Sequence, residues 1–194
     1  LGEKCWEAGT GFLSIENNYP NLFGSQVDEL IEIVRSARRE LARRLEERHD
    51  LSSNEAGREA RRRINATLDV GHLNLFFRYF KPESLSQFQG MVIDDVKKII
   101  RAGVCAHIHM SDNDSYSDDH LALGDGNIPW KRIFEVLEEE GYDGLVIFET
   151  QTRGDWKIGA RDSLVALGLL PDTAVFSGPA GSQDFNIPPG KSRF

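Results

Sequence analysis

Four short stretches of the chain are apolar almost throughout and predict buried strands. They cover residues 11–16, 64–70, 102–110 and 144–149. Around them, apolar residues recur every three or four positions, which is typical of helices that bury one face. These helices are expected over residues 26–45, 52–63, 82–101, 130–140 and 155–169. Apolar strands that alternate with helices predict an α/β fold built on a parallel sheet.

Two of the predicted helices have recognisable starts. Ser52 followed by Glu55 has the form of a capping box, in which each side chain bonds a backbone amide near the other. Asn127 is expected to cap the helix that begins near Pro129, because asparagine is a common N-cap and proline a common first-turn residue. The arginine-rich segment 35–63 is interpreted as a solvated face with Glu–Arg pairs, and the alternative is that it binds an anion or a partner.

The composition is that of an ordinary globular domain, with 194 residues, 40% hydrophobic and 28% charged. No apolar run approaches the ~20 residues of a membrane span. The two cysteines, Cys5 and Cys105, are far apart, which favours a reduced, cytoplasmic protein over a disulfide-bonded one. A net charge of −8 argues against a general nucleic-acid binder.

Each predicted strand ends at or near a residue that can bind a metal. These residues are Glu16, Asp69, His109 and Glu149, and His72 follows Asp69 after a glycine turn. Because the carboxyl ends of parallel strands meet at one rim of a barrel, the side chains are expected to come together. Two glutamates, one aspartate and one imidazole suit Mn²⁺, Co²⁺, Zn²⁺ or Mg²⁺. Without a cation, the clustered carboxylates would repel each other.

The loop that follows the third strand holds further candidates. His107 shares a strand face with His109 and is interpreted as a histidine of the barrel interior, with a role as a ligand as the alternative. Asp112 is expected to stabilise the loop rather than to take part in catalysis. Asp118 and His120 follow within a few residues. The sequence therefore places several metal-type ligands beside the third strand end.

Five motifs follow one another in an order that resembles a known superfamily. They are SIEN (Ser14–Asn17), LDVGHLN (Leu68–Asn74), HIHMSDND (His107–Asp114), DDHLALGDGNIPW (Asp118–Trp130) and VIFET (Val146–Thr150). Over most of residues 11–170 the chain resembles the xylose-isomerase-like TIM barrel superfamily. That superfamily includes sugar phosphate isomerases and epimerases and the related endonuclease-IV-type apurinic endonucleases. Each motif alone is weak evidence, and the set in this order is more specific.

The resemblance implies a role for the residues at the strand ends. It implies that Glu16, Asp69, His109 and Glu149 bind a divalent metal ion. It also implies that Glu16 and Glu149 are catalytic, exchanging a proton with the substrate carbon that they flank. His72 is implied as a third catalytic residue, in contact with a substrate oxygen.

For three further residues the resemblance implies more than one role. Asp118 and His120 match a second metal pair in the endonuclease branch, and sugar-isomerase-like members carry a similar loop. Together with His107, they are candidates for binding a second metal ion or the substrate. Two histidines that the endonucleases contribute from earlier strands have no counterpart in this chain, which disfavours that branch.

The chain matches only part of the superfamily's architecture. A (β/α)₈ TIM barrel has eight βα units in ~250 residues, and the sequence contains the equivalent of the last four. Residues 1–170 are therefore expected to form the carboxyl-terminal half of such a barrel. Within it, 38–63 is expected as an inserted helical segment, and 171–194 as a mobile tail rich in Pro, Gly and Ser. Four strands cannot close a barrel, so the chain is expected to lack an amino-terminal half or to form a homo-oligomer.

The predicted function is that of a divalent-metal-dependent isomerase or epimerase of a sugar or sugar phosphate. The reaction would transfer a proton next to a carbonyl through a cis-enediolate. A metal-dependent, apurinic-endonuclease-like phosphodiesterase is one alternative, which the acidic charge disfavours. A non-catalytic or partner-dependent half-barrel is the other. The expected partner is a small sugar, and neither a membrane nor nucleic acid is expected.

Overall fold

The computed structural model describes residues 1–150, 156–168 and 170 of the 194-residue chain. Its centre is a four-stranded sheet in which the strands lie in chain order and all neighbours are parallel. The strands are β1 (Leu13–Glu16), β2 (Ile64–Asp69), β3 (Cys105–Met110) and β4 (Leu145–Phe148). The predicted α/β fold with a parallel sheet is confirmed. The predicted tail, 171–194, lies outside the described residues.

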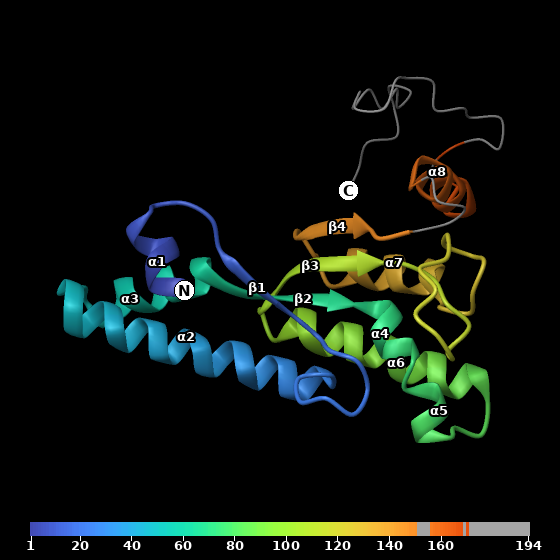
Figure 1. Cartoon of the computed structure of the whole chain (residues 1–194), viewed down its shortest axis with the longest axis horizontal. Helices are drawn as coiled ribbons and strands as arrows, with labels where there is room; N and C mark the ends of the chain where they lie inside the picture. The colour runs from blue at the N-terminus through green and yellow to red at the C-terminus, as the bar shows by residue number, and fades with distance from the viewer. Residues whose placement is uncertain (151–155, 169, 171–194) are drawn as a thin grey trace.

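Helices connect and flank these strands (Figure 1). They are α1 (Gly2–Glu7), α2 (Val27–His49), α3 (Ser53–Arg63), α4 (Val70–Asn74), α5 (Phe77–Phe80), α6 (Leu85–Arg101), α7 (Trp130–Glu139) and α8 (Trp156–Ala166). The apolar spacing does not predict α4 and α5, because each is shorter than two turns. None of the described helices is both long and apolar enough to cross a membrane.

One face of the sheet packs against helices. Ala66 and Leu68 of β2 and Ile108 of β3 are fully buried, and they share one apolar cluster with Val34 of α2 and Val96 of α6. Figure 1 shows α2 and α6 running along this side of the strands. Because side chains alternate along a strand, the residues next to these buried ones point to the opposite face.

The opposite face of the sheet is partly open. Thr67, His107 and Leu145 lie side by side across β2, β3 and β4. Leu145 is 60% exposed and Ile147 is 38% exposed, although both are apolar strand residues. In the part of the chain that the structure describes, no strand pairs with the outer edge of β1 or of β4. The sheet is therefore an open, partial barrel, as the sequence predicts.

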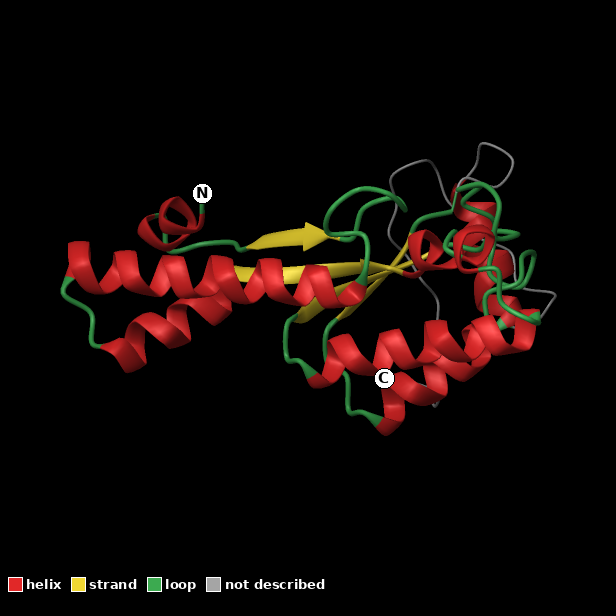
Figure 2. Ribbon diagram, turned by 90° about the horizontal axis from the view of Figure 1, so that it is seen from below, coloured by secondary structure: helices red, strands yellow, loops and turns green. Residues whose placement is uncertain are grey.

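A helical lobe extends beyond the strands (Figure 2). It consists of α1, α3 and the second half of α2, and its buried residues include Leu41, Leu45, Ala56 and Ala60. Its outer surface carries the predicted Glu–Arg pairs, for example Arg43 with Glu40 and Glu47. That residues 38–63 form an insertion relative to the superfamily stays a prediction.

Arg38 departs from the expected solvated face. Its Nε donates a hydrogen bond to the carbonyl of Ile64 at 2.7 Å, and its Nη1 donates to the carbonyl of Gly103 at 3.0 Å. Its Nη2 donates to Asn65 Oδ1 at 2.8 Å. These acceptors lie at the start of β2 and just before β3. Arg38 therefore ties α2 to the amino-terminal ends of two strands, a structural role that local spacing does not reveal.

The two predicted helix starts have opposite outcomes. The capping box predicted for α3 is present. The prediction for Asn127 is wrong, because α7 begins at Trp130 with Pro129 as its N-cap. The Asn127 amide oxygen instead accepts hydrogen bonds from Asn74 at 2.7 Å and Ser115 at 2.9 Å. Its side chain therefore joins distant segments rather than ending a helix.

Candidate functional site

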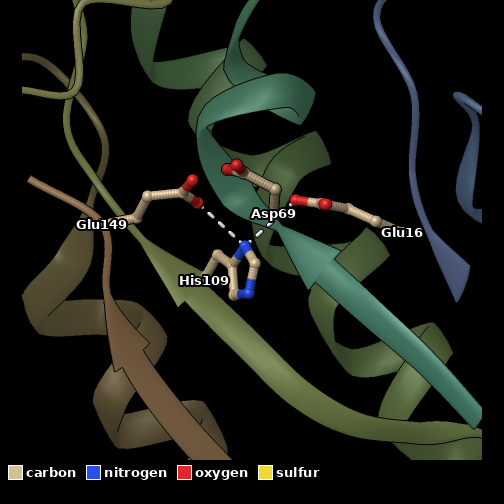
Figure 3. A group of neighbouring side chains, drawn as sticks. All are labelled: Glu16, Asp69, His109 and Glu149. Carbon is tan, nitrogen blue, oxygen red and sulfur yellow. Dashed lines mark ion pairs between the residues drawn. The ribbon is translucent and has the colours of Figure 1, made fainter. Parts of the chain in front are cut away.

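Four side chains that can bind a metal meet at the carboxyl ends of the strands (Figure 3). They are Glu16 at the end of β1, Asp69 at the end of β2, His109 near the end of β3 and Glu149 directly after β4. One ligand atom from each residue lies within 4.8 Å of the others. The register explains this, because Asp69 is paired with His109, and His109 with Ile147, two residues before Glu149. The structure thus brings together the four residues predicted as ligands.

His109 lies between the two glutamates of this group. Its Nδ1 is 3.0 Å from Glu16 Oε1 and 2.8 Å from Glu149 Oε2. The contact with Glu16 raises the pKa of His109 against the opposing effect of burial, and Glu149 adds to the rise. In return, the contact with His109 lowers the pKa of Glu16. The two glutamates therefore favour the protonated form of His109.

Asp69 is the most deeply buried member of the group, with 1% of its surface exposed. Its Oδ1 accepts hydrogen bonds from the backbone amides of Gly71 at 2.7 Å and His72 at 3.3 Å, which also begins α4. The Asn17 side chain bonds both backbone groups of Asp69, at 2.9 Å and 2.7 Å. Burial raises the pKa of Asp69 to about 6, and the neighbouring carboxylates add to the rise.

Three buried atoms of the group have no hydrogen-bond partner among the described residues. They are Asp69 Oδ2, His109 Nδ1 and Glu149 Oε2. The contact between His109 and Glu149 is short, but its geometry is not that of a hydrogen bond. Because buried polar atoms are nearly always paired, this set of atoms needs a further partner. Three carboxylates and one imidazole, without a thiolate, fit a divalent ion that accepts oxygen and nitrogen ligands.

His72 lies beside this group rather than in it. Its Nδ1 is 2.8 Å from the carbonyl oxygen of Asn17, which fixes one side of the ring. Its Nε2 is 3.6 Å from Asp69 Oδ2 and 3.5 Å from Asp118 Oδ2. Burial favours the neutral ring, but Asp118 and Asp69 outweigh burial and raise the pKa of His72 to about 9. His72 can therefore donate a hydrogen bond toward the group at neutral pH.

Asp118 and His120 form a pair next to His72. His120 Nε2 is 3.1 Å from Asp118 Oδ2, and His120 Nδ1 is 2.9 Å from the carbonyl oxygen of Glu149. The contact with His72 holds the pKa of Asp118 at about 2, against the effect of burial. Asp118 Oδ1 is buried and has no hydrogen-bond partner among the described residues. The pair is thus anchored to the strand end that carries Glu149.

Two other candidates from the sequence lie outside the group. His107 Nδ1 is 3.4 Å from Thr67 Oγ1, and its ring packs on Phe12 with centroids 5.1 Å apart, on the sheet face that would line the interior of a closed barrel. Asp112 is fully buried and accepts hydrogen bonds from the backbone amides of the loop that carries the Asp118–His120 pair. A side chain at Gly126 would collide with Asp112. Asp112 therefore stabilises the loop, as expected.

Three residues near the site were not identified from the sequence. Asn17 clamps the backbone beside it, and Asn74 donates to Asn113 Oδ1 at 2.9 Å, which joins α4 to the loop after β3. Asn17 belongs to the SIEN motif and Asn74 to the LDVGHLN motif, so the motifs could have indicated that both residues lie near the site. Tyr19 donates a hydrogen bond to Asp118 Oδ2 at 2.8 Å and belongs to no such motif.

Comparison with known proteins places this geometry in a family context. A family profile described as a xylose isomerase-like TIM barrel matches residues 20–168. The uncharacterized protein MJ1311 of Methanocaldococcus jannaschii is 28% identical over 146 residues, which are 74% of this chain and 38% of that protein. The chain thus spans well under two thirds of this relative.

Solved structures with a similar fold include sugar epimerases. The crystal structure of a D-tagatose 3-epimerase-like protein matches with a TM-score of 0.54 and 24% identity, over 85% of this chain and 48% of that chain. D-Psicose 3-epimerase from Clostridium cellulolyticum H10 has a TM-score of 0.45 and 20% identity, over 86% of this chain and 50% of that one. The chain spans about half the length of these proteins. With the profile matched over residues 20–168, the resemblance is confirmed: the chain belongs to the xylose isomerase-like TIM barrel family.

Proposed function

We propose that this chain is the metal-binding half of a barrel that isomerises or epimerises a sugar or sugar phosphate. The observation that carries the proposal is the placement of Glu16 and Glu149 on opposite sides of His109 within one ligand group (Figure 3). Two carboxylates that face one centre can remove a proton from a carbon and return it from another direction. The names of the structural neighbours, a D-tagatose 3-epimerase-like protein and a D-psicose 3-epimerase, describe reactions of this kind.

A divalent ion such as Mn²⁺, Co²⁺, Zn²⁺ or Mg²⁺ would be held by Glu16, Asp69, His109 and Glu149. Such an ion polarises a carbonyl or hydroxyl oxygen of a bound substrate. One glutamate removes the proton from the carbon next to the carbonyl, which leaves a cis-enediolate of the sugar. The other glutamate, protonated from solvent beforehand, gives its proton to the opposite face of that carbon, which inverts it. For isomerisation the proton goes to the neighbouring carbon, and the hydroxyl on that carbon passes its proton to the enediolate oxygen. His72 Nε2 donates a hydrogen bond to a substrate oxygen.

A second candidate function rests on the Asp118–His120 pair beside the ligand group. With His107, these residues are candidates for a second metal ion or for the substrate. A second metal ion would favour phosphodiester hydrolysis at abasic DNA, whereas the net charge of −8 opposes DNA binding. The third candidate is a non-catalytic half-barrel that acts with a partner.

Both cysteines are free, which agrees with the proposed cytoplasmic location.

We expect the protein loaded with Mn²⁺ to incorporate deuterium from deuterium oxide into D-tagatose or D-psicose, on the carbon next to the carbonyl. A proton removed by a glutamate exchanges with solvent before it returns, so the isotope stays in the sugar. Glu149→Gln should lower the exchange by about 1000-fold, within the range that a positioned acid–base group contributes. NMR of the recovered sugar measures the exchange, and Glu138→Gln, an exposed change on α7, is the matched control.

The same preparations should leave abasic DNA intact. Cleavage of abasic DNA that requires Asp118 and His120, without exchange into either sugar, would place the phosphodiesterase ahead of the isomerase. A folded, metal-loaded protein that performs neither reaction would favour the non-catalytic half-barrel.

Metal affinity should fall steeply as the pH falls. The pKa of Asp69 is raised to about 6 and that of His109 is also raised, so both groups gain protons in mildly acidic solution. Both must lose those protons to bind a cation, so affinity is lost as the pH falls through the raised pKa of His109 and then through about 6, the pKa of Asp69. Titration with Mn²⁺ should give a dissociation constant at least roughly 100-fold larger at pH 5 than at pH 8.

Circular dichroism at both pH values serves as the control for folding. Asp94→Asn, which changes an exposed acid of α6, should leave the pH profile as it is in the unchanged protein. Equal affinity at both pH values in a folded protein would contradict the assignment of the buried ligands.

The open sheet face should make the chain associate. Exposed strand edges and apolar residues such as Leu145 and Ile147 normally mark an interface. We propose that a second copy or an amino-terminal half completes the barrel, because four parallel strands cannot close one. Light scattering should show a complex of at least two chains, which Leu145→Lys weakens and the control Glu138→Lys does not. A monomer that melts cooperatively would contradict this proposal.

A further inference from the structure

Tyr19 links the loop after β1 to the loop after β3 through a single hydrogen bond. It lies in the loop between β1 and α2, two residues after Asn17, whose side chain clamps Asp69. The Tyr19 hydroxyl donates a hydrogen bond to Asp118 Oδ2 at 2.8 Å. Asp118 lies in the loop between β3 and α7, 99 positions later in the chain. The bond therefore links the loops after β1 and β3 above the ligand group.

Asp118 Oδ2 is the meeting point of three side chains. Besides the Tyr19 hydroxyl, His120 Nε2 lies at 3.1 Å and His72 Nε2 lies at 3.5 Å. The shortest of these contacts is the one from Tyr19. Loss of the hydroxyl would thus leave Asp118 to the two imidazoles and remove its tie to the loop after β1.

The aromatic ring of Tyr19 fixes His72 from another side. The two ring centroids are 4.6 Å apart, and the ring planes are tilted by 38°. The Asn17 carbonyl already holds His72 Nδ1 at 2.8 Å. With Tyr19 on the face of the imidazole and Asn17 at its edge, the orientation of Nε2 toward Asp69 and Asp118 is restricted. Tyr19 is 46% exposed, so these contacts leave part of its side chain in solvent.

We propose that Tyr19 is a positioning residue for the proton-transfer reaction. Its hydroxyl holds Asp118 and its ring holds His72, so that His72 Nε2 faces the substrate oxygen in the orientation that the transition state needs. This inference rests on the proposed isomerase or epimerase function, and it adds a residue to which neither the motifs nor the ligand group assign a role.

The test compares Tyr19→Phe with Tyr79→Phe. The first change removes the hydroxyl on Asp118 and keeps the ring on His72. The second removes a hydroxyl of the same region, which accepts a hydrogen bond from Asn21 at 3.0 Å and has no contact with the ligand group. With D-tagatose as the probe and Mn²⁺ bound, Tyr19→Phe should lower kcat about tenfold, the effect of one lost hydrogen bond in the transition state, and leave KM within about twofold. Tyr79→Phe should change neither constant.

A second readout does not depend on activity. The chain has five histidines, so their ring signals can be assigned by single substitutions in a proton–carbon NMR spectrum. Tyr19→Phe should shift the signals of His72 and His120 and leave that of His49, which lies in the helical lobe at the end of α2, unchanged. In an Asp118→Asn background, Tyr19→Phe should have a much smaller effect on His72, because two residues in one network are not additive.

The possible results separate this inference from the proposed function. Shifted His72 and His120 signals in a protein without sugar exchange would support the positioning and overturn the isomerase proposal. Normal exchange, with kcat and both signals unchanged in Tyr19→Phe, would overturn the positioning and leave the isomerase proposal standing. A change in the His49 signal would mean that Tyr19→Phe has lost its fold. In that case the His72, His120 and His49 signals are compared in Tyr19→Leu and in Asp118→Asn instead.

Discussion

Mutual repulsion of clustered carboxylates, of which Asp69 is buried, is the constraint on which the rest of this structure depends. Three carboxylates and one imidazole place their ligand atoms within 4.8 Å of one another, where the acids oppose each other's ionisation. The raised pKa of Asp69 reflects part of that repulsion, and the raised pKa of His109 favours a compensating positive charge on its ring. A divalent cation would offset most of the repulsion and would also pair the buried atoms of the group that have no hydrogen bond.

The surrounding scaffold keeps these groups together despite their repulsion. Asn17 bonds the backbone of Asp69 across two strands, and the first amides of α4 bond its carboxylate. Asn74 and Asp112 secure the loop after β3 through buried hydrogen bonds. The amides of α4 bond only Oδ1 of the Asp69 carboxylate, so its Oδ2 stays free to face the centre of the group.

One face of the sheet is not covered by other elements among the described residues. Helices cover one face, whereas the face that carries the ligand group also presents Leu145 and Ile147 to solvent. In a closed barrel this face would be the packed interior. The proposed function and the proposed completion of the barrel are thus linked, since a site at the rim of an open sheet is exposed on the side where further strands would lie.

Local patterns predicted the strands, the longer helices and the meeting of the four strand-end residues. They missed the short helices α4 and α5 and the contacts between distant segments. Apolar periodicity is a property of neighbouring residues, and parallel strands bring their ends together, so Glu16 and Asp69 could be placed in one site. Tyr19 and its acceptor are 99 positions apart, and Asn127 bonds Asn74 across 53 positions. Neither contact has a signature in the local spacing.

The most direct test of the central claim is anomalous diffraction from crystals of the protein grown with Mn²⁺. We expect one strong peak bonded to all four strand-end ligands, Glu16, Asp69, His109 and Glu149. The peak should be lost in crystals of Asp69→Asn, where the most deeply buried carboxylate is replaced by an amide of the same shape. No peak in this group, or a peak bonded only to Asp118 and His120, would contradict the claim that the four strand ends form a metal site.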